Sequence, residues 1–195
     1  MIKKSALTYF LGFIMGVMLS IVLLKTFPSI YHLFTGALVK KLEIQKQIIP
    51  NLPLMLIVNN ILASLICAFG GYAFAKLYLH REIKRANLYH VTLNIFPIFV
   101  LFVSGFVLGA FLPPFIKDLS TYFSLLLPHG IFELPATILS GSIGFDIAST
   151  SPQIIDSLEK FEERVDDMLN NRRREYMTVV ILLVIGGILE GIWPL

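Results

Sequence analysis

The residues most able to do chemistry lie in residues 128–135, where two ionisable side chains stand in apolar surroundings. His129 and Glu133 are four residues apart, so a helix places both on one face. The helix-breaking residues around them are Pro128, Gly130 and Pro135. Because proline removes a backbone donor, Pro135 leaves the carbonyl of Ile131 without its usual partner. The segment therefore predicts a polar site on a kinked or interrupted helix.

Other polar residues stand inside apolar runs of the chain. Glu190 is a second carboxyl in such a run, and Asn59, Asn60 and Asn94 are amide candidates. Ionisable groups at membrane depth are costly, and they face the interior of a helix bundle or a polar cavity. We therefore group His129, Glu133, Glu190, Asn59 and Asn60 as one candidate intramembrane polar site.

Three interpretations of His129 and Glu133 compete. They form a hydrogen-bonded lock between helices, a proton or ion pathway, or part of a metal site. Zinc needs three or four ligands, so Glu190 or a second subunit must complete that last arrangement. The sequence contains no H-E-x-x-H, G-x-S-x-G or Walker-type glycine loop. We therefore predict no enzymatic activity and no cofactor.

The elements that position these residues are membrane-spanning helices. Of 195 residues, 56% are hydrophobic and 15% charged, and mean hydropathy is +0.77. Soluble domains carry about 25% charged residues, and a span needs about 20 apolar residues. Such runs occupy residues 5–27, 53–79, 91–112, 122–147 and 176–194. They lack the two-residue alternation of barrel strands. The sequence predicts an all-α polytopic membrane protein, a single domain over 1–195 with five spans, the first retained and the fourth broken.

Basic residues predict the orientation. Eleven of the 16 Lys and Arg residues fall on the side of the N-terminus. By the positive-inside rule this favours a multi-pass protein of the cell membrane with a cytoplasmic N-terminus and an external C-terminus. A formal net charge of +3 gives no reason to expect a nucleic-acid partner.

Two connecting segments show helical periodicity. In residues 30–42 the apolar positions suit a helix lying in the membrane interface or an arm packed on the same protein. In residues 152–171, Ser151 and Pro152 suit a helix start, and an apolar stripe opposes an acidic face. This cytoplasmic stripe must be covered, either by the membrane domain itself or by a dimer or partner protein.

Small residues recur one helical turn apart in three spans. The motifs are Gly12-xxx-Gly16, Gly105-xxx-Gly109 and Gly187-xxx-Gly191. Glycines at this spacing let helix backbones approach closely, where van der Waals contact drives association in lipid. The motifs fit packing within one chain or between two copies.

Several of these features together resemble the stage II sporulation protein M (SpoIIM) family of small membrane proteins. Residues 128–136, followed by Gly141 and Gly144, are similar to the signature of that family. Residues 59–71 resemble its asparagine-to-glycine segment, and residues 190–194 its terminal glutamate and proline. The resemblance marks His129, Glu133, Pro135, Glu190 and Pro194. It departs at Phe145-Asp146-Ile147, where we expect a basic residue, and at the acidic segment that follows.

The resemblance implies a function through partners. The sporulation member belongs to a complex that remodels the septal envelope together with peptidoglycan-degrading proteins. We therefore predict an integral membrane scaffold or assembly protein acting in envelope or membrane remodelling. Its expected partners are membrane lipid and either further copies of the chain or other envelope proteins. The alternative is a small channel or transporter whose polar site is formed by His129, Glu133 and Glu190.

Overall fold

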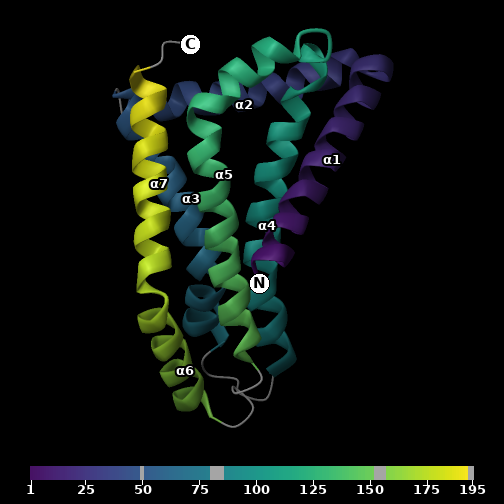
Figure 1. The fold of residues 1–195 in the computed structure, drawn as a ribbon. Coiled ribbons are helices and arrows are strands. Elements are labelled where there is room, and N and C mark those ends of the chain that lie inside the picture. Colours follow the sequence, from purple (N-terminus) through teal and green to yellow (C-terminus); the bar gives the residue numbers. More distant parts are fainter. Residues whose placement is uncertain (49–50, 80–85, 152–156, 193–195) are drawn as a thin grey trace.

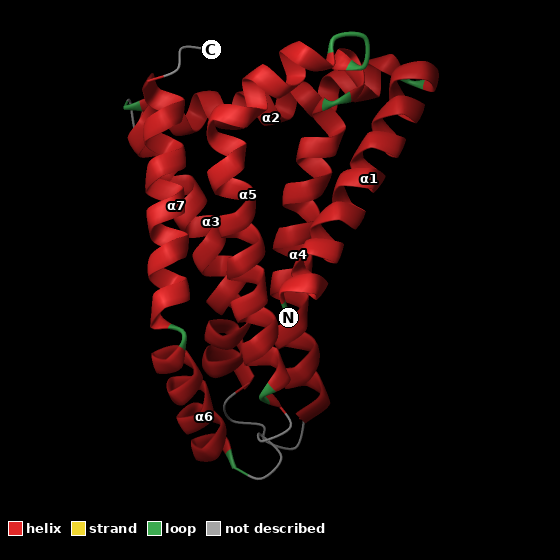
Figure 2. Ribbon diagram, viewed as in Figure 1, coloured by secondary structure: helices red, strands yellow, loops and turns green. Residues whose placement is uncertain are grey.

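The fold is helical almost throughout the chain (Figure 2). The computed structural model describes residues 1–48, 51–79, 86–151 and 157–192, and no strand occurs in those ranges. The prediction of an all-α fold is confirmed. The long helices of the bundle are α1 (Ile2–Thr26), α3 (Leu52–Phe74), α4 (Ala86–Phe111), α5 (Leu119–Ser149) and α7 (Arg173–Ile192). Each coincides with one predicted span, although most of them start a few residues earlier.

Four of these helices are long and apolar enough to cross a membrane. The candidate spans are Ile2–Thr26, Leu54–Leu77, Leu88–Phe115 and Gly130–Ser149. The second continues from α3 into a π-helical turn, η1 (Ala75–Leu79), and the third ends in the 3-10 turn η3 (Pro113–Phe115). Helix α7 lies beside α5 and α3 (Figure 1), but it is not among the four. The side chains of its last three residues, 190–192, lie outside the described part of the chain.

The proline-rich segment is a bend and not a break. Helix α5 is continuous from Leu119 to Ser149 and passes through Pro128, Gly130 and Pro135 without interruption. Figure 1 shows its first part crossing the end of the bundle before the helix turns to run through it. The predicted interruption is therefore wrong, whereas the predicted kink is present. A proline in a helix costs one backbone hydrogen bond and bends the axis, while the turns on either side remain helical.

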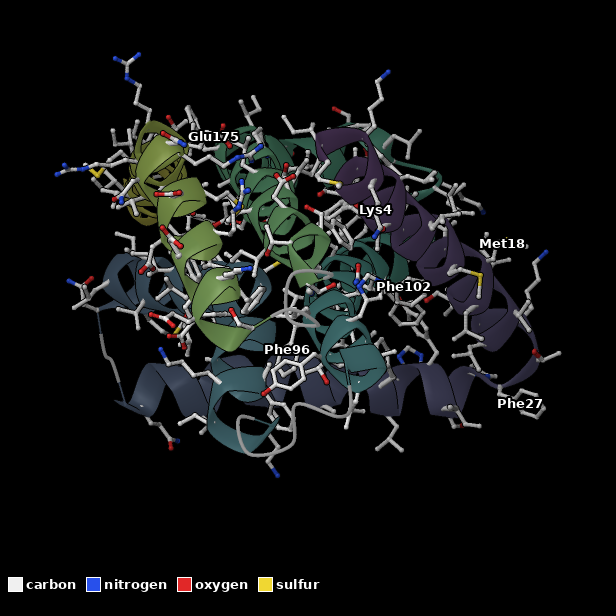
Figure 3. All side chains as sticks on the ribbon, turned by 90° about the horizontal axis from the view of Figure 1, so that it is seen from below. Lys4, Met18, Phe27, Phe96, Phe102 and Glu175 are labelled. Carbon is white, nitrogen blue, oxygen red and sulfur yellow. The ribbon has the colours of Figure 1, made fainter. Side chains whose placement is uncertain are left out.

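Two glycine motifs form the contact between α1 and α4. A methyl group added at Gly12 or Gly16 would overlap the carbonyl oxygen of Phe102 or Phe106. The relation is reciprocal, because one added at Gly105 or Gly109 would overlap a carbonyl of Tyr9 or Phe13. Figure 3 shows Phe102 next to α1. These two motifs thus pack on one another within the chain, the first of the two predicted uses.

Helix α2 (Pro28–Ile48) lies across one end of the bundle (Figure 1). Tyr31 is buried and the ring of Phe34 meets that of Phe106 edge to face, so one side of α2 packs on the same protein. Ile30, Leu33 and Ile44 stay exposed on a separate stripe. The predicted packing of this segment on the same protein is therefore present. Its predicted place in the membrane interface stays a prediction, and the exposed apolar stripe is compatible with it.

The apolar stripe of helix α6 (Leu158–Asn171) packs against the membrane helices of the same chain. Phe161 and Val165 are buried in a cluster with residues of α3, η1, α4 and α5. This is the first of the two predicted coverings. The helix starts later than predicted, because Ser157 caps it by accepting a 3.1 Å hydrogen bond from the Lys160 amide. The expected start at Pro152 lies outside the described residues.

Candidate functional site: a polar cavity between the helices

The centre of the candidate site is a hydrogen bond between two helices. Asn60 of α3 donates through Nδ2 to Oε1 of Glu133 on α5. The neighbouring Asn59 donates to Asn60 Oδ1 at 3.4 Å. One turn further along α5, the Thr137 hydroxyl donates to the Glu133 carbonyl at 2.8 Å. Three residues that the sequence marked as polar candidates therefore meet at one place, although 73 positions separate Asn60 from Glu133.

These side chains line a cavity of about 730 Å³ between α1, α3, α4 and α5. Small-molecule sites have volumes of about 300–1,000 Å³, so the cavity has the size of a ligand pocket. Its polar lining residues are Tyr9, Asn59, Asn60, Ser64, Ser104, Glu133 and Thr137. Ala63 of α3 and apolar side chains of α4 and α5, with Gly130 and Pro135, form the rest. The arrangement can hold a molecule by hydrogen bonds on one side and by apolar contact on the other.

Two tyrosines fix the end of α4 that borders this cavity. The last four carbonyls of a helix have no partner within it. The Tyr122 hydroxyl of α5 donates to the Leu108 carbonyl at 3.1 Å, and that of Tyr31 in α2 donates to the Ala110 carbonyl at 3.2 Å. Sequence reasoning missed both contacts, because the spacing of a tyrosine along the chain does not reveal which distant carbonyl it reaches.

The described side chains supply no further ligand for the predicted metal site. Among them, no group of three His, Cys, Asp or Glu residues lies close enough together to hold an ion. The side chains of His129 and Glu190 lie outside the described residues, although their backbones belong to α5 and α7. The predicted metal site at His129 and Glu133, and the place of Glu190 in the polar site, stay predictions.

Comparison with known proteins places this arrangement in a family. A model of the family described as stage II sporulation protein M matches residues 5–194, nearly the whole chain. The chain belongs to the SpoIIM family. The residues that match the SpoIIM model therefore run from α1 to α7 and include those that line the cavity.

One similar protein is the uncharacterized protein MJ0706 of Methanocaldococcus jannaschii, which is 32% identical over 100 residues. The match covers 51% of this chain and 46% of MJ0706, so the chain matches about half the length of that relative. No solved structure matches the chain.

The departure from the SpoIIM pattern has a structural counterpart at the other end of the bundle. Asp146, which stands where we expected a basic residue, is 2.7 Å from Nη1 of Arg172, at the junction of α6 and α7. The same guanidinium nitrogen is 3.0 Å from Oε2 of Glu175. Arg172 thus joins α5 to the junction of α6 and α7 through this ion pair. The sequence did not predict this pair, because spacing along the chain does not show that Arg172 reaches Asp146.

Further contacts tie this end together. Lys4 of α1 donates to Asn94 of α4 at 3.1 Å, and its ammonium lies 3.9 Å from the centre of the Phe145 ring on α5. Figure 3 shows Lys4 on the end of α1 that faces the viewer. Lys76 of η1 is 3.0 Å from Glu162 of α6. Lys4 and Lys76 therefore each join two separate elements of the bundle.

The bond between Asn60 and Glu133 makes a testable contribution to stability. We expect Asn60→Ala to lower the free energy of unfolding by about 1–2 kcal/mol, because it removes a hydrogen bond between helices. Glu133→Gln keeps an acceptor oxygen for Asn60 and should cost less. An SDS titration of the detergent-solubilised protein measures both, with the lipid-exposed Leu62→Ala on the same helix as the control. A larger loss in Glu133→Gln than in Asn60→Ala would contradict this order.

Proposed function

We propose that the protein is an integral membrane scaffold, which holds partner proteins or further copies of itself during envelope or membrane remodelling. The observation that carries the proposal is the polar bond between Asn60 and Glu133, which uses the carboxyl at membrane depth to hold α3 against α5. The paired glycine motifs of α1 and α4 have the same effect at a second helix contact. Such fixed helices suit a protein that presents surfaces, and we assign it no catalysis.

The two ends of the bundle offer the surfaces that a scaffold needs. Exposed acidic residues of α6 lie opposite its buried apolar stripe; they are Glu159, Glu163, Asp166 and Asp167. Helix α2 presents an exposed apolar stripe and Lys40 at the opposite end. We assign the end with α6 to the cytoplasm and the end with α2 to the outside, because the positive-inside rule favours that orientation. Membrane lipid is then the partner of α2, and proteins are the partners of α6.

Thiol access tests the scaffold and the orientation together. Cys67 is buried and is replaced by alanine, and single cysteines are then placed at Phe132, Leu134, Lys40 or Lys160 in sealed vesicles. We expect a membrane-impermeant maleimide to label position 40 from outside only and position 160 from inside only. Positions 132 and 134, which flank an intact Glu133, should not react from either side. Labelling of position 134 would show water at Glu133 and would contradict a purely structural role for the carboxyl.

The cavity itself favours a second candidate function, a small transporter or channel. Glu133 and the two asparagines line a space large enough for a solute, and carboxyls at membrane depth mark ion and proton pathways in other proteins. Proton or cation flux into proteoliposomes tests this candidate. Flux that Glu133→Gln abolishes, while Leu62→Ala leaves it intact, would replace the scaffold by a conducting role. Background leakage in all samples supports the scaffold.

A further inference from the structure

The cavity is open at the depth of the hydrocarbon. Several of the α4 and α5 side chains that line it are exposed. Phe99 is 65% exposed, Ile131 59% and Phe123 47%. Phe99 and Ile131 belong to candidate membrane spans, so the medium at this opening is lipid. Figure 1 shows α4 and α5 diverging toward the end where α2 lies. A molecule can therefore enter sideways from the bilayer.

Water is a poor occupant of this space. A cavity of about 730 Å³ would have to hold many waters at once. Apolar side chains form most of the walls, and a buried water needs two to four polar partners. An acyl chain meets the same walls without losing hydrogen bonds.

The polar side chains specify what the occupant must carry. A carboxyl and two amides line one side of the cavity, and the described lining residues include no Lys, Arg or His. An anionic phosphate would have to approach the Glu133 carboxyl, and a quaternary ammonium would have to leave water to enter between apolar walls. A hydroxyl group both donates and accepts hydrogen bonds, so it suits the Glu133 carboxyl and the Asn60 amide alike.

The depth of these groups agrees with an uncharged lipid. Asn60 lies six residues inside the candidate span that begins at Leu54. At 1.5 Å per residue this is about 9 Å below the end of the span, which is beneath a charged headgroup layer. Lipids without a charged headgroup can place a hydroxyl at that level.

We propose that the cavity binds an uncharged lipid with a free hydroxyl, of the diacylglycerol class, which enters between α4 and α5 and hydrogen-bonds Glu133 and Asn60. The apolar walls of α4 then hold its chains. This inference goes beyond the scaffold role and does not depend on it, since a transporter would have the same cavity.

A photoreactive lipid tests the proposal. The full chain is placed in phosphatidylcholine vesicles with a diacylglycerol that carries a diazirine on one acyl chain, and crosslinked peptides are identified by mass spectrometry. We expect saturable crosslinks to α4 and α5 around the cavity, which excess dioleoylglycerol removes and dioleoylphosphatidic acid does not. Equal competition by the anionic lipid would overturn the assigned class. Crosslinks spread evenly over exposed faces, including α1 near Met18, would overturn the site.

Two matched variants on α3 locate the site independently. Ala63 lines the cavity, whereas the neighbouring Leu62 is exposed on the outside of the same helix. Ala63→Phe should lower the saturable crosslink about tenfold, equivalent to about 1.4 kcal/mol of binding, while Leu62→Phe leaves it unchanged. If Ala63→Phe fails to fold, competition in the wild-type protein alone decides the question. Equal labelling of both folded variants contradicts the proposed site.

Discussion

Gly105→Ala is expected to destabilise the protein by about 1–3 kcal/mol, although it adds only one methyl group. The new carbon would overlap the carbonyl oxygen of Tyr9 in α1, which is backbone and cannot rotate away. The two helices must therefore separate, and the neighbouring contacts at Gly109 and Gly12 loosen with them. Van der Waals packing drives helix association in lipid, so a wider separation costs free energy directly. An SDS titration of the detergent-solubilised variant measures the loss.

Gly36→Ala is the matched control for this change, because a methyl group at Gly36 on α2 meets no atom within 4 Å. Alanine favours a helix over glycine by about 0.8–1.0 kcal/mol, so this variant should be as stable as the wild type or more stable. Glycine-to-alanine substitution should therefore lower the free energy of unfolding at position 105 and preserve or raise it at position 36. A stable Gly105→Ala protein would mean that α1 and α4 can move apart at little cost. Loss of an oligomer without loss of monomer stability would instead assign the motif to a homodimer.

The sequence predicted the helices well because lipid imposes a strong length requirement. A run of about 20 apolar residues is hard to produce by chance, and each of the five runs became a helix with similar ends. The bend of α5 was also predictable in kind, since Pro128 and Pro135 are local causes. Its extent was not. Whether a proline bends or breaks a helix depends on neighbouring helices and side chains, which a single chain segment does not contain.

The candidate site was predictable as a set of residues but not as a structure. Polar groups in apolar runs stand out, so Asn59, Asn60 and Glu133 could be named. That Asn60 reaches Glu133, or that their surroundings form a cavity, depends on how α3, α4 and α5 pack. Ser104 was missed because a serine hydroxyl in a helix commonly bonds its own backbone and gives no signal. Tyr9 was missed because a tyrosine in an apolar run is usual in a membrane helix.

The second large effect is expected for Arg172→Gln, at the opposite end of the bundle. Arg172 lies within 3.0 Å of both Asp146 and Glu175, and the side chains of Arg172 and Asp146 are only 27% and 16% exposed. Without the guanidinium, two carboxylates face one another in a partly buried site. Breaking a fully buried pair costs about 3–5 kcal/mol, and the remaining exposure reduces this to about 1–3 kcal/mol. The loss appears as a lower free energy of unfolding in detergent.

A double-mutant cycle with Asp146→Asn separates the ion pair from other effects of the substitution. Removing both charges leaves no unpaired carboxylate at position 146, so the double variant should regain at least part of the loss. Arg173→Gln makes the same change at the exposed neighbouring residue and should stay within about 0.5 kcal/mol of the wild type. Strict additivity of the two single changes would show that Asp146 and Arg172 do not interact. Coupling between them would instead mean that the ion pair between Asp146 and Arg172 fastens the junction of α6 and α7 to α5.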